Sequence, residues 1–200
     1  MASSFARLAR SVERAARLQV SKHPVDNPPF DIHQLGAETL RAPARRISKV
    51  DDAVRDLARD MLVSMYAARG IGLAAPQIGF DLQLLVIDLE IEDHNSAPLV
   101  LINPSITAVG GSLCTYEEGC LSIPGVYLDV VRPSVVDVSY RDEMGRPKRI
   151  KADGLMARCI QHEMDHLNGV LFVDRVTDHE KLSTGLGEKG FDPAHVRAIA

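Results

Sequence analysis

Two histidines and a glutamate stand close together in the segment QHEMDHL, at His162, Glu163 and His166. On an α-helix, residues four apart are separated by about 40° around the axis and about 6 Å along it, so both imidazoles share one face. The two rings can then bind one metal ion, and the glutamate can reach a water molecule at that ion, as in the H-E-x-x-H metal hydrolases. The spacing therefore predicts metal-assisted hydrolysis, with Glu163 as the general base.

A catalytic metal of this kind needs a third protein ligand and an open position for water. The longer pattern H-E-x-x-H-x-x-G-x-x-H is followed as far as Gly169, but Phe172 stands where the third histidine would be. Another class of hydrolase uses a downstream glutamate. Glu188 is available, but it lies in a glycine-dotted tail that is a poor platform. We therefore expect the third ligand to come from elsewhere in the chain.

The three cysteines supply that alternative. Cys120 is the best candidate, in a loop distant in sequence, because Gly119 before it lets the backbone turn tightly toward a metal. A coordinated thiol would be deprotonated by the ion. Cys114 and Cys159 are weaker choices. From the residues alone, Cys120 is either this ligand or a small buried apolar side chain.

A helix over residues 153–169 must present the two imidazoles. Asp153 can cap its start, and Gly169 follows its end. Apolar side chains surround much of its circumference: Leu155, Cys159, Ile160, Met164 and Leu167. A helix that is apolar on most sides is buried, and its polar groups then need partners such as a metal ion.

The remaining elements predict the fold class. Apolar residues at helical spacing indicate a helix over residues 51–70, with Asp51 or Asp52 at its start and Gly70 at its end. Strands are predicted over residues 81–89, 98–104 and, on both sides of a turn with Gly145 and Pro147, 133–152. The tail after residue 176 has no firm assignment. We predict an α+β fold in which antiparallel strands wrap around the central buried helix that carries the H-E-x-x-H motif.

The first 30 residues differ from the body of the chain. Residues 1–20 predict an amphipathic helix with arginines on one face, which is either a solvated extension or an organelle transit peptide. Residues 21–31 contain three prolines and predict a linker or an extended arm. We divide the chain into an N-terminal extension (1–30), a metal-dependent catalytic domain (31–180) and a polar C-terminal tail (181–200).

Composition narrows the class of protein. A chain of 200 residues favours one domain. A net charge of -4 and the lack of tryptophan argue against a nucleic-acid site. The apolar runs are too short to span a bilayer, so no membrane partner is expected. Three cysteines without a secretory signal indicate a reducing compartment.

Three segments together resemble the signature motifs of the peptide deformylases. GIGLAAPQIG (70–79), EEGCLSIPG (117–125) and QHEMDH (161–166) match the family patterns G-x-G-L-A-A-x-Q, E-G-C-L-S and Q-H-E-x-D-H, in the family's order. The resemblance covers about residues 30 to 180, and the glycine before the cysteine is similar to the bacterial and plant-organelle type.

The resemblance implies an activity and a cofactor. These hydrolases remove the formyl group from the N-terminal methionine of newly made polypeptides and release formate. The implied ligands are Cys120, His162 and His166, which hold one divalent ion. That ion is usually Fe²⁺ in the family, although the ligand types suit Zn²⁺ equally well, and Ni²⁺ or Co²⁺ are further alternatives.

The resemblance also implies roles for individual residues. A water molecule on the metal attacks the formyl carbon, and Glu163 acts as general base and then general acid. Gln77 and the backbone N–H of Leu121 stabilise the oxyanion.

Substrate is expected to lie extended beside Gly70, Ile71 and Gly72, and Gly119 is a further expected substrate-binding residue. Candidates for the methionine pocket are the neighbours of His162 on its helix and the region of Ile71 and Leu73.

Charged residues near the motifs have weaker interpretations. Glu117 and Glu118 are solvated loop charges, or Glu118 supports the motif through polar contacts, with Arg132 as its partner. Asp165 is expected to accept a hydrogen bond from a ligand histidine.

Two other functions compete with this one: a zinc peptidase with a histidine or glutamate as third ligand, and a binding module with a closed structural metal site. The expected partners are formylmethionyl nascent polypeptides and, transiently, the ribosome. The expected location is the bacterial cytoplasm or, if residues 1–20 are a transit peptide, an organelle stroma or matrix.

Overall fold

The computed structural model describes residue 18 and residues 20–199. The amphipathic helix predicted over residues 1–20 therefore falls almost wholly outside the described residues. The strands are β1 (Gly72–Ala74), β2 (Leu84–Ile87), β3 (Leu99–Cys120), β4 (Ile123–Arg141) and β5 (Pro147–Asp153). The helices are α2 (Asp52–Ala67), α3 (Gly154–Leu167) and α4 (His179–Glu188), with single 3-10 turns η1 (Glu38–Arg41), η2 (Ala75–Ile78), η3 (Phe172–Arg175) and η4 (Pro193–His195). All five strands pair antiparallel in chain order, so the predicted antiparallel α+β class is confirmed.

Helices α2 and α3 pack on opposite faces of the sheet at β2. Leu84 and Val86 belong to the apolar cluster of α2, whereas Leu85 and Ile87 belong to the cluster of α3. This alternation follows from the two-residue period of a strand. All four positions are buried, which explains why β2 reads as an uninterrupted apolar run.

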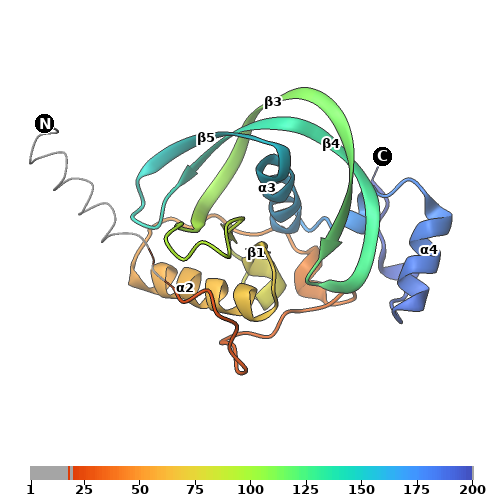
Figure 1. Ribbon diagram of the computed structural model, residues 1–200, viewed down its shortest axis with the longest axis horizontal. Helices are drawn as coiled ribbons and strands as arrows, with labels where there is room; N and C mark the ends of the chain where they lie inside the picture. The colour runs from red at the N-terminus through yellow and green to blue at the C-terminus, as the bar shows by residue number, and fades with distance from the viewer. Residues whose placement is uncertain (1–17, 19, 200) are drawn as a thin grey trace, which may run out of the picture.

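Strands β3 and β4 are long and strongly curved. Their pairing shifts register at four places, among them between Gly110 and Leu113 and between Gly119 and Cys120. Such bulges bend a strand and increase its twist. Figure 1 shows the result: β3, β4 and β5 arch over α3.

Most residues of α3 are buried. Asp153 occupies the N-cap position, although its side chain makes no capping hydrogen bond. Gly169 follows the helix with φ +71°, a left-handed conformation that favours glycine. Ten of the fourteen helix residues are buried, including both histidines and the glutamate between them. Leu155 differs from the expectation, because it is 47% exposed and borders a cavity.

Helix α2 starts as predicted but does not end at Gly70 as expected. Asp51 caps the start of α2 and accepts a hydrogen bond from the Val54 N–H. The left-handed residue after α2 is Arg69, with φ 56°, rather than Gly70. Gly70 is required for space instead, since a Cβ atom there would lie 2.5 Å from the Leu121 Cδ1 atom.

The sheet and the C-terminal part contain more regular structure than predicted. Strand β3 continues to Cys120 and β4 begins at Ile123, whereas no strand was predicted between residues 104 and 133. The glycines and prolines of this segment fall at bulges or on exposed positions of a two-stranded ribbon, where they are tolerated.

Helix α4 was not predicted, because its glycines weaken helix propensity. It forms because Leu182 and Leu186 are buried against β4.

Candidate metal centre

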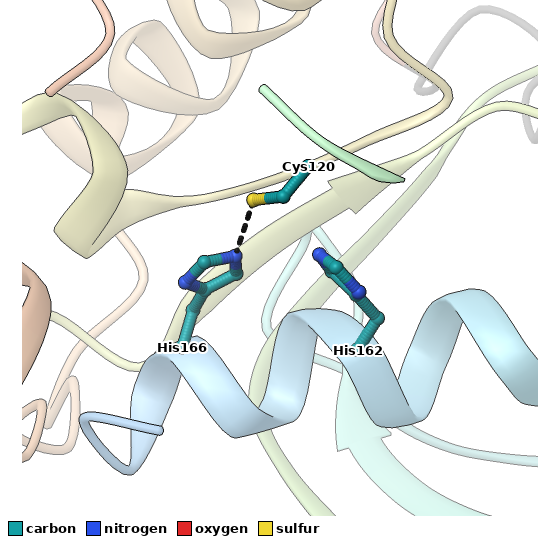
Figure 2. A group of neighbouring side chains, drawn as sticks. All are labelled: Cys120, His162 and His166. Carbon is teal, nitrogen blue, oxygen red and sulfur yellow. Dashed lines mark hydrogen bonds between the residues drawn. The ribbon is translucent and has the colours of Figure 1, made fainter. Parts of the chain in front are cut away.

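The three predicted metal ligands lie close together. The Cys120 Sγ atom and one ring nitrogen each of His162 and His166 are all within 4.8 Å of one another. The sulfur is 3.3 Å from the His166 Nε2 atom, and Figure 2 shows all three side chains pointing toward one another. The histidines stand on successive turns of α3, and Cys120 ends β3, so the expectation of a loop is wrong. Within residues 18 and 20–199, no other group of His, Cys, Asp or Glu residues meets this criterion, and Glu188 is not part of it.

Glu118 fixes the orientation of His162. Its Oε2 atom is 2.9 Å from the His162 Nδ1 atom, and its Oε1 atom accepts hydrogen bonds from Arg132 Nε at 2.6 Å and from Arg158 at 2.8 Å. Burial acts to raise the pKa of Glu118, but the hydrogen bonds from His162 and Arg132 outweigh burial and hold the pKa well below its usual range. An ionised acceptor at Nδ1 leaves the Nε2 lone pair of His162 available to a metal. Glu118 is therefore a buried, paired carboxylate and not a solvated loop charge.

The prediction for Asp165 is wrong, and the one for Arg132 is confirmed. Asp165 accepts hydrogen bonds from Arg132 at 2.6 Å and from Arg175 at 2.6 Å, not from a histidine. Arg132 therefore joins Asp165 to Glu118. Each of these buried charges has a hydrogen-bonded partner, as burial requires.

Two buried polar atoms at the group have no hydrogen-bond partner among the described residues: Glu163 Oε2 and His166 Nδ1. Burial raises the pKa of Glu163 to about 7. Burial lowers the pKa of His166 well below its usual range, so its imidazole is neutral and able to bind a metal through Nε2. One thiol and two imidazoles form a donor set that fits Fe²⁺, Zn²⁺ or a similar ion.

Gln77 is held beside the sulfur. Its Oε1 atom accepts a hydrogen bond from the Ala74 N–H at 2.8 Å. Its Nε2 atom donates to the Ser122 hydroxyl at 3.1 Å and lies 3.6 Å from the Cys120 Sγ atom. The amide oxygen is thus occupied by the backbone, and the amide nitrogen faces the three potential ligands.

A cavity of about 950 Å³ opens beside this group. Its lining includes the predicted residues Gly70, Ile71, Gly72, Gln77, Gly119, Cys120, Leu121, His162 and Glu163. Leu73 does not line the cavity, because its side chain is fully buried in the core. Of the expected pocket residues Ile71 and Leu73, only Ile71 lines the cavity. A cavity of this size exceeds what one methionine side chain fills.

Gly72 provides the space that Glu163 needs. A Cβ atom on Gly72 would overlap the Glu163 carboxylate and would lie 2.9 Å from the Cys159 Sγ atom. The close approach of this backbone to the helix therefore requires glycine.

Two residues of the site were not predicted. Ser122 lies inside the second motif, and that position was the available signal. Arg158 pairs with Glu118 and also donates to the Cys114 carbonyl oxygen at 2.7 Å. No pattern in the sequence distinguishes it from an exposed helix arginine, because its partners come from distant strands.

An antiparallel sheet curved over a helix, with a Cys-His-His donor group and a buried carboxylate at a cavity, is typical of the metal-dependent hydrolases. Comparison with known proteins specifies the family. A family model described as polypeptide deformylase matches residues 29–182, and the chain belongs to this family of metalloenzymes. It is therefore a hydrolase of the peptide deformylase type.

Relatives with this name match the chain along its whole length. The peptide deformylase of Synechococcus sp. (strain CC9605) is 65% identical over 100% of both chains. Peptide deformylase 2 of Prochlorococcus marinus (strain MIT 9313) is 63% identical over 100% of both. The crystal structure of a Synechococcus elongatus peptide deformylase in complex with actinonin has a TM-score of 0.91 and 58% identity, covering 92% of this chain and 100% of that one. A Legionella pneumophila peptide deformylase has a TM-score of 0.74 and 42% identity, over 80% of this chain and 94% of that one.

Proposed function

We propose that this chain removes the formyl group from the N-terminal methionine of newly made polypeptides, with one divalent ion held by Cys120, His162 and His166. One observation carries the proposal: the three ligand atoms lie within 4.8 Å of one another beside a buried Glu163 oxygen that has no partner. When bound, the ion supplies a Lewis acid that lowers the pKa of water and polarises a carbonyl group. Fe²⁺ is the expected ion, and Zn²⁺, Ni²⁺ or Co²⁺ suit the same donors.

Glu163 moves the protons of the reaction. Its Oε2 atom accepts a proton from the attacking water, whose oxygen bonds to the formyl carbon. The carbon–nitrogen bond then breaks, and Glu163 returns the proton to the departing amine. The products are formate and a free methionyl N-terminus. His162 and Glu163 are buried, which limits their contact with water and strengthens their interactions.

Gln77 and Leu121 stabilise the negative charge on the formyl oxygen. The Gln77 Nε2 atom is oriented by the bond from Ala74 to its amide oxygen, and the Leu121 N–H directly follows the ligand Cys120. Preoriented donors at such a site contribute about 3 kcal/mol each to transition-state stabilisation.

The substrate chain lies along the edge of the sheet. Strand β1 is an edge strand, with β2 as its single neighbour in the sheet, and Gly70, Ile71 and Gly72 line the cavity there. An extended peptide can add to such an edge through main-chain hydrogen bonds, which are insensitive to side chains. Gly119 lines the same cavity and packs against Tyr127, since a Cβ atom there would lie 2.5 Å from the Tyr127 ring.

The place of action follows from the substrate. Formylated nascent chains emerge from ribosomes, so we propose a transient ribosome contact in the cytoplasm of a bacterium. The relatives described above come from bacteria. None of the described helices combines the length and apolar character needed to cross a bilayer. An organelle stroma or matrix is the alternative if residues 1–20 are a transit peptide.

The decisive experiment measures formate release from formyl-Met-Ala by the Fe²⁺-loaded protein, prepared without oxygen. Cys120→Ala should lose both metal and activity, whereas the control Cys114→Ala removes a thiol outside the ligand group and should keep both. A metallopeptidase would retain metal and activity in Cys120→Ala. A closed structural site would release no formate above the metal-free protein, and either result would contradict the proposal.

A further inference from the structure

One side of the active-site cavity is formed by a segment that lies before the three motifs. This N-terminal arm (residues 20–31) contributes several lining residues: Val25, Asp26, Pro28, Phe30 and Asp31. The end of β3 and the start of β4 line the same cavity, the latter with Pro124, Gly125 and Tyr127. The arm therefore borders the cavity into which a substrate chain would extend beyond its first residue.

Lys22 anchors the start of the arm in the protein interior. Its Nζ atom is 2.7 Å from Asp88 Oδ2 and donates to the carbonyl oxygens of Glu90 at 2.8 Å and Asp93 at 2.9 Å. These contacts use all three donors of the ammonium group. The Lys22 side chain is only 3% exposed, and a lysine is rarely buried unless it is paired in this way.

Phe30 anchors the end of the arm. Its backbone N–H donates to the Ser64 hydroxyl on α2 at 3.1 Å, and its ring meets Phe80 edge-on at 5.4 Å between ring centres. Figure 1 shows the arm as the red segment that crosses α2. Because both ends are anchored, the residues between them are held at the cavity rather than left as a free linker.

We propose that the arm contacts the substrate polypeptide beyond its formylmethionine and favours basic side chains there. This proposal rests on the deformylase function proposed above. Asp26 and Asp31 are exposed at the cavity, and neither forms an ion pair with a described residue. Glu117, on β3, adds a third exposed carboxylate, and these three outnumber the one exposed cation of the same lining, Arg69. A lysine or arginine a few residues after the methionine would meet this negative potential, whereas an acidic residue would be repelled.

The test compares three C-terminally amidated substrates: formyl-Met-Ala, formyl-Met-Ala-Lys-Lys and formyl-Met-Ala-Glu-Glu. We expect kcat/KM for the lysine peptide to exceed that for the glutamate peptide about three- to fivefold at low salt, through KM, because exposed charge pairs have modest effects. The difference should shrink in 0.5 M salt, which screens exposed charges.

Asp26→Asn/Asp31→Asn removes the charges of the arm without touching its anchors. This variant should abolish the preference and leave formyl-Met-Ala unchanged. Glu38→Gln/Glu180→Gln makes the same change in net charge at exposed positions away from the cavity and should keep the preference. Equal rates for both charged peptides in the unaltered protein would overturn the proposal, as would a preference that survives in Asp26→Asn/Asp31→Asn.

Lys22→Met tests the anchor. It should raise KM for the lysine peptide towards that of the glutamate peptide while kcat for formyl-Met-Ala stays within about twofold. Tyr66→Phe is the matched control, because it removes a different hydrogen bond to the same Asp88 carboxylate and leaves Lys22 in place. If Tyr66→Phe reproduced the loss of preference, the arm would have no specific role. If no peptide released formate, the proposed function itself would fail.

Discussion

Two buried carboxylates line the same cavity but differ in their hydrogen bonds. Glu118, on β3, receives hydrogen bonds from Arg132, Arg158 and His162. The Oε2 atom of Glu163, on α3, has no partner among the described residues. The two residues differ in the sign of their pKa shifts for this reason: partners outweigh burial at Glu118, whereas burial dominates at Glu163.

The contrast distinguishes a carboxylate that orients its neighbours from one that takes part in the reaction. A carboxylate whose lone pairs are all occupied can orient its neighbours but cannot readily accept a proton. Burial without a partner disfavours the charged form of a carboxylate, and the cost falls when the carboxylate accepts a proton or a hydrogen bond from water. We therefore expect changes at Glu163 to act on turnover and changes at Glu118 to act on metal binding and stability.

The largest effect is expected for Glu163→Gln. The substitution keeps the size of the side chain but removes the proton acceptor, so formate release should fall about 10³-fold. Metal content, measured on the purified protein, should stay at one ion per chain, because Glu163 is not in the ligand group. An activity within tenfold of the unaltered protein would show that the unpartnered oxygen has no catalytic role.

Glu118→Gln should reduce turnover less than Glu163→Gln does, and should have a larger effect on metal affinity and stability. The amide cannot accept from His162, Arg132 and Arg158 together, and partners that orient a ligand histidine contribute 10- to 100-fold to metal affinity. The buried guanidinium groups of Arg132 and Arg158 would also lose their carboxylate partner. This loss should lower the free energy of unfolding by about 3 kcal/mol.

Competition with a metal chelator measures the affinity in Glu118→Gln, and urea unfolding measures the stability. Glu180→Gln, an exposed glutamate on α4, serves as control for both. Unchanged metal affinity in Glu118→Gln would remove the distinction between Glu118 and Glu163.

Local signals predicted the candidate site better than the rest of the molecule. His162 and His166 share a face because of helix geometry alone, and Cys120 was chosen from the motif around it. The predicted strand over residues 98–104 covers only the start of β3, because the bulges that accommodate Pro104, Gly110 and Gly111 depend on pairing with β4.

The long-range partners of residues outside the motifs could not be predicted. Lys22 is buried because Asp88, 66 residues later, lies beside it, and Arg158 is buried because Glu118 and the Cys114 carbonyl meet it from β3. Helix α4 similarly depends on its contact with β4. In each case the deciding interaction joins elements that only the folded chain brings together.

The smallest effect concerns a paired network away from the metal centre. The Tyr66 hydroxyl donates to Asp88 Oδ2 at 2.7 Å, and burial together with Asp88 holds the Tyr66 pKa far above its usual range. Because the pKa is higher in the folded protein, this contribution to stability is complete below about pH 10, the unfolded value, and is lost as the pH rises above it. Tyr66→Phe should therefore lower the free energy of unfolding by about 1 kcal/mol at pH 7.

The difference between Tyr66→Phe and the unaltered protein should narrow between pH 10 and 11 in urea unfolding curves, since the other tyrosines are common to both proteins. Formate release at pH 7 should be equal in the two, because Tyr66 does not line the cavity. A constant difference in stability across this pH range would mean that the hydroxyl does not ionise differently in the folded and unfolded chains. A loss of turnover would mean that paired, buried groups outside the cavity lining also govern the chemistry, and the contrast between Glu118 and Glu163 would no longer hold.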